Sequence, residues 1–329
     1  MNTPEVGLDI ELYNTFGSDF DRFQFPADIY RVTAGHGGEA LLIVGSEKTA
    51  LYDCGMSYCG DKTVENIAEI LAALKEAGRV CEDRLDYILL SHSHYDHLGA
   101  LPDILDRYPE AIVCGSEKCK KVLSSENAKK LMTQLGTEAR ELYTPGSQKP
   151  IRTDHLRVDV VLQDGDTISL GNETITAYVT KGHTDCSLSF YLEPVGLLFT
   201  SESTGILEGK DYVHTPSLKS FPDSIESSYK CEEIHPKYIC LPHFGMIPPY
   251  FNEKYFVEFR KECHSKMDLV RTLMKEGRSY DEMLAIYIKR YWTPAKEMEQ
   301  PIEAFEINSG HILNALIRAV EEEGDKENV

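Results

Sequence analysis

Four side chains that can bind a metal ion fall within six consecutive positions of this sequence. His92, His94, Asp96 and His97 directly follow the apolar run at 85–90. On a helix these residues would spread over more than half of the circumference, at about 100° per residue, whereas a loop that leaves a strand can wrap around an ion. Imidazoles clustered with one carboxylate suit zinc, iron or manganese, because calcium and magnesium prefer oxygen ligands. We therefore predict a transition-metal site rather than a solvated polar loop.

Three later segments each place one more ligand-type residue beside a turn. His183, Glu202 and His243 each come shortly after a short apolar run with strand character. Taken singly, His183 or His243 would more often be a capping or core residue than a ligand. Four strand ends that all deliver metal-binding groups form a joint pattern, which predicts that these groups converge on one or two divalent ions of zinc, iron or manganese.

The elements that must position these residues follow from the hydrophobic periodicity. Short strands are predicted at 39–44, 49–53, 85–90, 111–114, 156–162, 174–179, 187–192, 196–200 and 238–241. Helices are predicted at 61–77, 102–108, 223–234, 252–275, 280–290 and 308–323, with helical composition across 116–143 and a loop at 144–154. This order of strands and helices is typical of two stacked sheets whose outer faces are covered by helices.

In their order, the motifs resemble the metal motifs of the metallo-β-lactamase superfamily. They are H-x-H-x-D-H at 92–97, G-H-T at 182–184, L-F-x-x-acid at 198–202 and P-H-x-G at 242–245. The resemblance covers about residues 28–250 and implies an α/β fold, a four-layer αβ/βα sandwich. It suggests a catalytic domain at 1–250 and a helical C-terminal extension at 251–329, which could act as a lid or a dimer face.

The resemblance also implies a role for each ligand. One ion would be held by His92, His94 and His183, the second by Asp96, His97 and His243, with Glu202 as the bridge. Asp53 resembles the superfamily's early strand-end aspartate, which supports the metal loop. The bridging residue of the superfamily is usually aspartate, so the longer Glu202 leaves open whether one or two ions bind.

A hydrolase that cleaves an ester-like bond with a metal-bound hydroxide is the function that we expect. Asp96 is the candidate to orient the hydroxide and to move a proton. The segments 91–117 and 182–191 look most like the quinolone-signal response thioesterase and related members, which ranks a thioester first, then a lactone or phosphodiester, and a β-lactam last. Four neighbours of the ligands could line the substrate pocket, although packing roles are at least as frequent: Tyr95, Cys186, Ser201 and Phe244.

Two other classes of function stay open. A metal-bearing regulatory or binding protein with weak hydrolysis would use the C-terminal helices as a partner surface. Diiron redox chemistry on the same scaffold is disfavoured, because position 94 is a histidine rather than the acid that such members tend to use.

The composition narrows the choice of partner and compartment. The 329 residues include 34 Lys+Arg and 54 Asp+Glu, and a net charge of -20 argues against a nucleic-acid partner. No run approaches the roughly 20 apolar residues of a membrane helix, and the first twenty residues have no continuous apolar core. The nine scattered cysteines are typical of reduced thiols. We expect a cytoplasmic protein, not bound to a membrane, that acts on a small molecule and could form a homodimer.

Overall fold

The computed structural model describes residues 25–26, 28–80, 82–208, 212–243, 245–293, 296 and 302–327. The chain forms two compact units. Unit 1 comprises 1–179, 186–200 and 236–248, and unit 2 comprises 180–185, 201–235 and 249–329. The domain boundary at residue 250 stays a prediction.

The first sheet of unit 1 has the strand order β1-β2-β3-β4-β5-β6. Its strands are β1 (Ile29–Arg31), β2 (Leu41–Val44), β3 (Thr49–Tyr52), β4 (Tyr87–Leu89), β5 (Ile112–Gly115) and β6 (Val160–Val161). β3 and β4 run parallel with Tyr52 opposite Leu89. Because parallel strands end at the same edge of a sheet, the segments after β3 and β4, which begin with Asp53 and Leu90, lie side by side.

The second sheet of unit 1 has the strand order β14-β13-β10-β9-β8-β7. Its strands are β7 (Thr167–Ser169), β8 (Thr174–Val179), β9 (Leu188–Glu193), β10 (Leu197–Phe199), β13 (Tyr238–Leu241) and β14 (Gly245–Met246). β10 and β13 are parallel, and the other neighbours are antiparallel.

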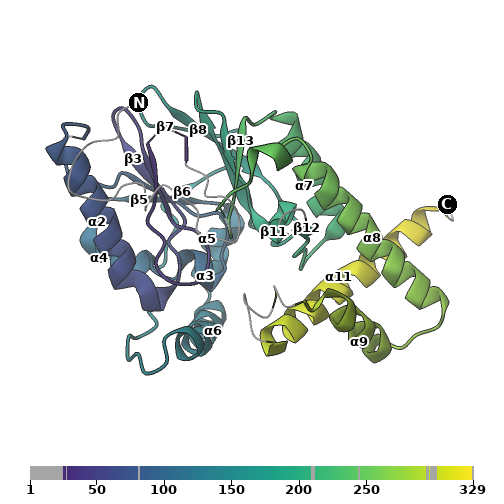
Figure 1. Cartoon of the computed structure of the whole chain (residues 1–329). Helices are drawn as coiled ribbons and strands as arrows, with labels where there is room; N and C mark the ends of the chain where they lie inside the picture. Colours follow the sequence, from purple (N-terminus) through teal and green to yellow (C-terminus); the bar gives the residue numbers. More distant parts are fainter. Residues whose placement is uncertain are drawn as a thin grey trace. The chain divides into compact units, whose positions relative to one another are not determined.

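Helices cover the outer face of the first sheet. They are η1 (Ser57–Cys59), α2 (Gly60–Glu76), α3 (Tyr95–Leu98), α4 (Leu101–Arg107), α5 (Glu117–Leu123) and α6 (Glu126–Tyr143). Figure 1 shows α2 and α4 together on one side of the strands. Successive residues of a strand point to opposite faces, so Leu42 packs in the core with α2 and α4, while Leu41 and Ile43 join Phe190 and Phe199 in the core between the sheets.

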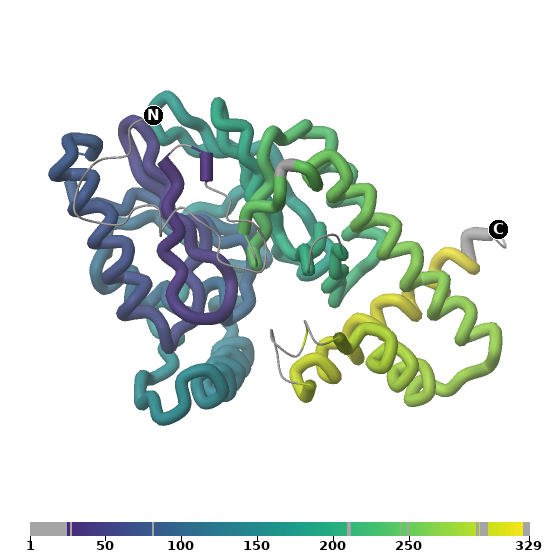
Figure 2. The backbone as a smooth tube through the Cα atoms, viewed as in Figure 1, coloured from purple at the N-terminus to yellow at the C-terminus, as the bar shows by residue number. Residues whose placement is uncertain are grey.

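Unit 2 holds the remaining elements. They are η2 (Glu202–Thr204), β11 (Ile206–Glu208), β12 (Tyr212–His214), α7 (Phe221–Glu233), η3 (Pro249–Phe251), α8 (Tyr255–Lys275), α9 (Tyr280–Tyr291) and α11 (Ile302–Glu327). α11 packs against both α8 and α9, and α8 also packs against α7 and β12. Figure 2 traces α8, α9 and α11 in green to yellow. The α/β architecture with C-terminal helices that the sequence predicts is confirmed.

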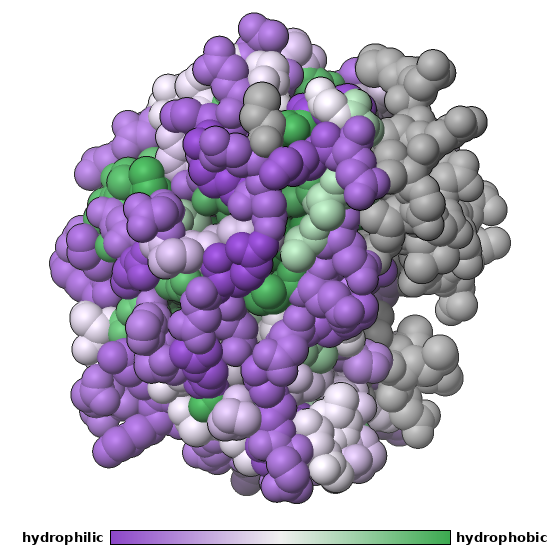
Figure 3. All heavy atoms as spheres, turned by 90° about the vertical axis from the view of Figure 1, so that its left-hand side faces the viewer, coloured by the Kyte–Doolittle hydropathy of each residue, from purple (hydrophilic) through white to green (hydrophobic). Residues whose placement is uncertain are grey.

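One face of the molecule shows how polar and apolar residues are distributed on the surface. The face on the side of α2 is mostly hydrophilic, with small separate hydrophobic patches (Figure 3). Among the described helices, none combines the length and the apolar character needed to cross a bilayer.

Two expectations about local structure need correction. The prediction of a loop through residue 97 was wrong, because Tyr95–Leu98 form one helical turn in which the carbonyl of His94 accepts from the N–H groups of His97 and Leu98, at 3.1 and 3.2 Å. The sequence also missed β1, β7, β11, β12 and β14. Each has only two or three residues, too few for a periodic pattern.

Candidate metal centre

Three ligand atoms of unit 1 converge on one point. Asp96 and His97 lie on α3, and His243 lies in the turn between β13 and β14. The Nε2 atoms of His97 and His243 are 3.0 Å apart, and Oδ2 of Asp96 is 3.5 Å from the first and 3.3 Å from the second. Ligands about 2.0–2.2 Å from a tetrahedral zinc ion would lie about 3.3–3.6 Å apart. The donor atoms suit a divalent transition metal, and the two distances from Asp96 lie within this range, whereas the two Nε2 atoms are slightly closer than an ion between them would hold them.

A buried carboxylate fixes the orientation of His97. Asp53 is fully buried, and its Oδ2 lies 2.9 Å from Nδ1 of His97. The same carboxylate accepts from the backbone N–H of Ser91 at 2.8 Å and from its hydroxyl at 2.6 Å. With Nδ1 donating to Asp53, the Nε2 lone pair of His97 is directed to the convergence point. A carboxylate behind a histidine ligand in this way sets its tautomer and raises its basicity.

The backbone of Gly38 lies directly against this ring. Its N–H donates to the carbonyl of Asp96 at 3.0 Å. A Cβ atom at position 38 would lie 2.4 Å from Nδ1 of His97, closer than side chains approach one another. Glycine is required here because the backbone passes so close to the ring of His97, the predicted ligand.

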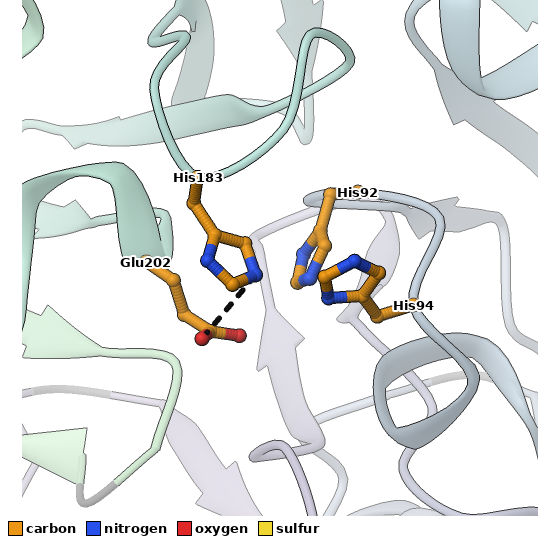
Figure 4. Close-up of side chains that lie close together, drawn as sticks. All are labelled: His92, His94, His183 and Glu202. Carbon is orange, nitrogen blue, oxygen red and sulfur yellow. Dashed lines mark ion pairs between the residues drawn. The ribbon is translucent and has the colours of Figure 1, made fainter. Parts of the chain in front are cut away.

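His92 and His94 extend the histidine cluster of unit 1. Their ring centroids are 4.5 Å apart, and the ring of His92 lies 4.3 Å from that of His97. His92 is buried, with Nδ1 2.9 Å from the hydroxyl of Ser91. Figure 4 shows both rings on the loop that follows β4. Ser91 thus contacts both the supporting acid and one of the predicted ligands.

Unit 2 contributes a second histidine–carboxylate pair. Nε2 of His183 lies 3.4 Å from Oε2 of Glu202, the ion pair drawn as a dashed line in Figure 4. Nδ1 of His183 is 2.5 Å from the carbonyl of Pro216, and its backbone N–H donates to the hydroxyl of Ser203 at 3.0 Å. A backbone carbonyl accepts only from a protonated nitrogen, so Nδ1 of His183 carries a proton, and in the neutral ring the lone pair on Nε2 is available to a metal ion shared with Glu202.

Glycine also shapes the turn before His183. Gly182 has φ +137, a conformation that side chains rarely adopt, and a Cβ there would meet Ser224, including its backbone nitrogen at 2.7 Å. Its carbonyl accepts from the N–H groups of Lys219 and Ser220, both at 3.0 Å. The turn is thereby held against the start of α7.

Comparison with known proteins decides the family. The sequence pattern of the metallo-beta-lactamase superfamily matches residues 34–243. The chain belongs to this superfamily. It is 27% identical over 192 residues to the metallo-beta-lactamase fold-containing protein ST1585 of Sulfurisphaera tokodaii, an alignment that covers 57% of this chain and 72% of that protein.

One further relative is similar in sequence over part of the chain, and one solved structure is similar in fold. The atrochrysone carboxyl ACP thioesterase of Aspergillus fumigatus is 30% identical over 120 residues, which covers 36% of this chain and 20% of the thioesterase. The structure of the metallo-beta-lactamase family protein TTHA1429 of Thermus thermophilus superposes with a TM-score of 0.60 and 16% identity, covering 90% and 94% of the two chains. At that identity the likeness shows the fold alone.

Several predictions from the sequence are thereby confirmed. They are the superfamily, its α/β fold and a metallo-hydrolase with one or two divalent metal ions as cofactor. Which residue holds which ion stays a prediction.

Two of the four predicted substrate residues of this superfamily member, Tyr95 and Cys186, pack in different parts of unit 1. Tyr95 packs against a small cluster with Met56 and Tyr58, and burial, with Asp96 adding to the effect, raises the pKa of its hydroxyl. Cys186 is buried in the core beneath α2, and its thiol donates to the hydroxyl of Ser93 at 3.3 Å.

The structure says less about the other two predicted substrate residues, Ser201 and Phe244. Ser201 is fully buried in unit 2, with its hydroxyl 2.9 Å from that of Thr180. Phe244 lies outside the described residues. All four substrate-binding assignments stay predictions.

Sequence reasoning missed the groups that hold the ligands from behind. These are Ser91, Ser203 and the carbonyl of Pro216. Ser91 directly precedes His92, and that adjacency was the available signal. The other two join His183 only through tertiary structure, which one sequence does not reveal.

Proposed function

We propose that this metallo-hydrolase cleaves an ester-like bond of a small molecule, with thioesters favoured over lactones, phosphodiesters and β-lactams. The observation that carries the proposal is the convergence of Asp96, His97 and His243 within 3.0–3.5 Å, with buried Asp53 behind His97. The similarity to a thioesterase over 36% of this chain supports the ranking of thioesters.

We infer that the predicted ligands form two sets. The first is His92, His94, His183 and Glu202, and the second is Asp96, His97 and His243. The hydrogen bonds of His97 to Asp53 and of His183 to Pro216 support Nε2 as the ligand atom of each of these histidines. Glu202 reaches the Nε2 atom of His183, so a longer acid than aspartate can share an ion with that histidine. When bound, divalent ions supply Lewis acidity, which polarises a carbonyl group and lowers the pKa of water.

Side chains of this centre have separate roles in proton transfer, in orienting a ligand and in binding the substrate. The side chain of Asp96 is 18% exposed, so its carboxylate can accept a hydrogen bond from an attacking water and take up a proton at an oxygen. Asp53 holds His97 still while this happens, because it is fully buried and anchored to Ser91. The hydroxyl of Tyr95 stays protonated near neutral pH, since its pKa is raised, and can donate to a substrate oxygen.

The proposal is tested by loading metal-free protein with zinc, manganese or iron and assaying matched thioester, lactone, phosphodiester and β-lactam substrates. Asp96→Asn should lower kcat on a thioester by about 10²- to 10⁴-fold, the usual contribution of general acid–base catalysis. Elemental analysis reports how much metal the variant keeps, which separates a proton-transfer role from loss of the ion. Asp61→Asn, at an acid with a 79% exposed side chain on α2, is the matched control. Absence of hydrolysis with every metal and substrate would remove the proposal.

A further inference from the structure

A fully buried lysine in unit 2 lacks a hydrogen-bond partner among the described residues. Lys266 on α8 is fully buried, and its Nζ lies 4.7 and 5.8 Å from the ring centroids of Tyr291 and Tyr287 on α9. No atom of the described chain accepts a hydrogen bond from this nitrogen. Cation–π attraction offsets part of the cost of burying the charge, but ring faces are weak substitutes for acceptors to three N–H donors.

The polar atoms near this lysine are also short of acceptors. The Tyr287 hydroxyl and Nδ1 of His214 are buried and have no hydrogen bond within the described part of the chain. Oε1 of Glu208 is 3.7 Å from Nδ1 of His214, but it pairs closely with Lys296. The other nearby acid, Glu262, accepts from the hydroxyl of Tyr212 at 3.1 Å. Neither carboxylate accepts a hydrogen bond from Lys266.

These donors adjoin the metal-ligand pair of the same unit. Burial lowers the pKa of His214, and the charges that act on its ring are those of Lys266, Glu202 and His183. β12, which ends at His214, packs against α8. Burial lowers the pKa of Lys266 to about 8, so the ammonium form still predominates at pH 7. The result is a buried positive charge whose N–H groups have no acceptor among the described residues, in the same unit as His183 and Glu202.

We propose that Lys266, Tyr287 and His214 bind a carboxylate group of the substrate. A carboxylate offers two oxygens with about four acceptor positions and one negative charge, which complements one ammonium, one hydroxyl and one ring N–H. A phosphate monoester carries nearly two negative charges at neutral pH, which a single ammonium group does not neutralise. The substrate class is thus an acyl ester or thioester that carries a carboxylate away from the scissile bond. The inference that the carboxylate belongs to a substrate rests on the proposed function. The cluster of buried donors is observed independently of that function.

Binding at this place requires a change in the tyrosine side chains. All three donor atoms are closed to solvent, so a carboxylate enters only when side chains around them move, and we propose that the rings of Tyr287 and Tyr291, which lie near Nζ of Lys266, rotate. Both rings belong to α9, whose main packing partner is α11.

The first test measures binding without turnover. Succinate is titrated into the full-length, metal-loaded protein while its melting temperature is followed, with succinamide as the neutral counterpart, because a ligand of the native state raises the melting temperature. We expect succinate alone to raise it, in the wild type and in Lys261→Met, at a 65% exposed lysine on α8. Lys266→Met should abolish the shift, and Tyr287→Phe should reduce it. An equal shift in Lys266→Met would overturn the inference, because it is the result expected if succinate binds to the metal ions. The absence of a shift in the wild type would overturn it as well.

The second test separates this inference from the proposed function. Pairs of thioesters that differ only in a terminal carboxylate or its methyl ester are compared. Charged hydrogen bonds predict a preference for the carboxylate on the order of tenfold to a hundredfold in kcat/KM, lost in Lys266→Met. Equal hydrolysis of both thioesters would sink the carboxylate site and leave the proposed function standing. Binding of succinate that depends on Lys266, without hydrolysis of any thioester, would sink the proposed function instead.

Discussion

Asp53 orients a predicted metal ligand without offering an atom to the metal itself. Asp53→Asn keeps the size of the side chain, and asparagine tolerates its positive φ of 49. The variant loses the charge that accepts from His97 and Ser91. Zinc affinity should fall by about 10- to 100-fold, the usual effect of removing a partner of a metal-ligating histidine, as measured by competition with a chromophoric chelator.

The matched control is another buried aspartate of unit 1. Asp103 on α4 pairs with Lys149 and Arg152, at 3.0 and 3.2 Å, rather than with a predicted ligand. Asp103→Asn should lower the stability of the fold and leave zinc affinity unchanged. An Asp53→Asn variant that binds zinc as tightly as Asp103→Asn would show that Asp53 is not needed to position His97.

The close approach of Gly38 to His97 leads to a second prediction. Gly38→Ala places a methyl group 2.4–2.9 Å from three ring atoms, so His97 must move from its bond to Asp53. We expect loss of one bound zinc ion per chain, or at least a tenfold weaker site, in elemental analysis of the purified variant. Gly310→Ala on α11, where a Cβ meets only the Tyr280 hydroxyl at 3.5 Å, should retain all its metal.

At the scale of elements, the sequence predicts the helices that are long enough for their apolar residues to form a periodic pattern. Helices such as α2 and α8 were expected because their apolar residues recur over four or more turns. The strands around the metal motifs were expected because each is a short apolar run, followed by one or more residues of ligand type. Strands such as β11, β12 and β14 have two or three residues and no longer apolar run around them, and their pairing depends on partners elsewhere in the chain.

The N-terminus of α9 offers a prediction about an element alone. The hydroxyl of Ser279 accepts from the N–H of Glu282, whose carboxylate accepts from the N–H of Ser279, a complete capping box. Ser279→Ala should lower the free energy of unfolding by about 1 kcal/mol, as measured by urea denaturation, with metal content unchanged. Ser279→Asp restores the capping acceptor and should recover most of the loss. If the aspartate variant were as unstable as the alanine variant, the cap would not be the cause.

At the scale of the whole molecule, the sequence predicted the metal-binding motifs and the helical C-terminal segment. It did not predict the cluster of buried donors in unit 2 that consists of Lys266, Tyr287 and His214. Lys266 is one lysine within a long helix, and such a residue usually faces water. Its spacing from Phe259, Cys263 and Val270 nevertheless places it on the buried face of α8. The absence of an acceptor within the described residues became visible only when α9 and β12 were folded against that face.

This buried charge makes the stability of the protein depend on pH in a defined direction. The pKa of Lys266 falls from 10.5 to about 8 on folding, chiefly through burial and against the opposing effect of Glu262. Below pH 8 both states hold the proton, so the folded state carries the full cost, about 3 kcal/mol for such a shift. Between pH 8 and 10.5 the folded state releases its proton first, so the cost declines and then vanishes.

Lys266→Met should therefore be more stable than the wild type at pH 7, by up to about 3 kcal/mol, with an advantage that shrinks as pH rises from 8 to 10.5. The other groups that face Lys266 are Cys263, His214, Tyr287 and Tyr291. Burial raises the pKa of Cys263, Tyr287 and Tyr291 and lowers that of His214, so these groups stay neutral through this range. Urea denaturation of both proteins from pH 6 to 10.5 measures the difference. If Lys266→Met were the less stable protein at pH 7, the two tyrosine rings would satisfy the ammonium by themselves, and the lysine would serve packing rather than a ligand.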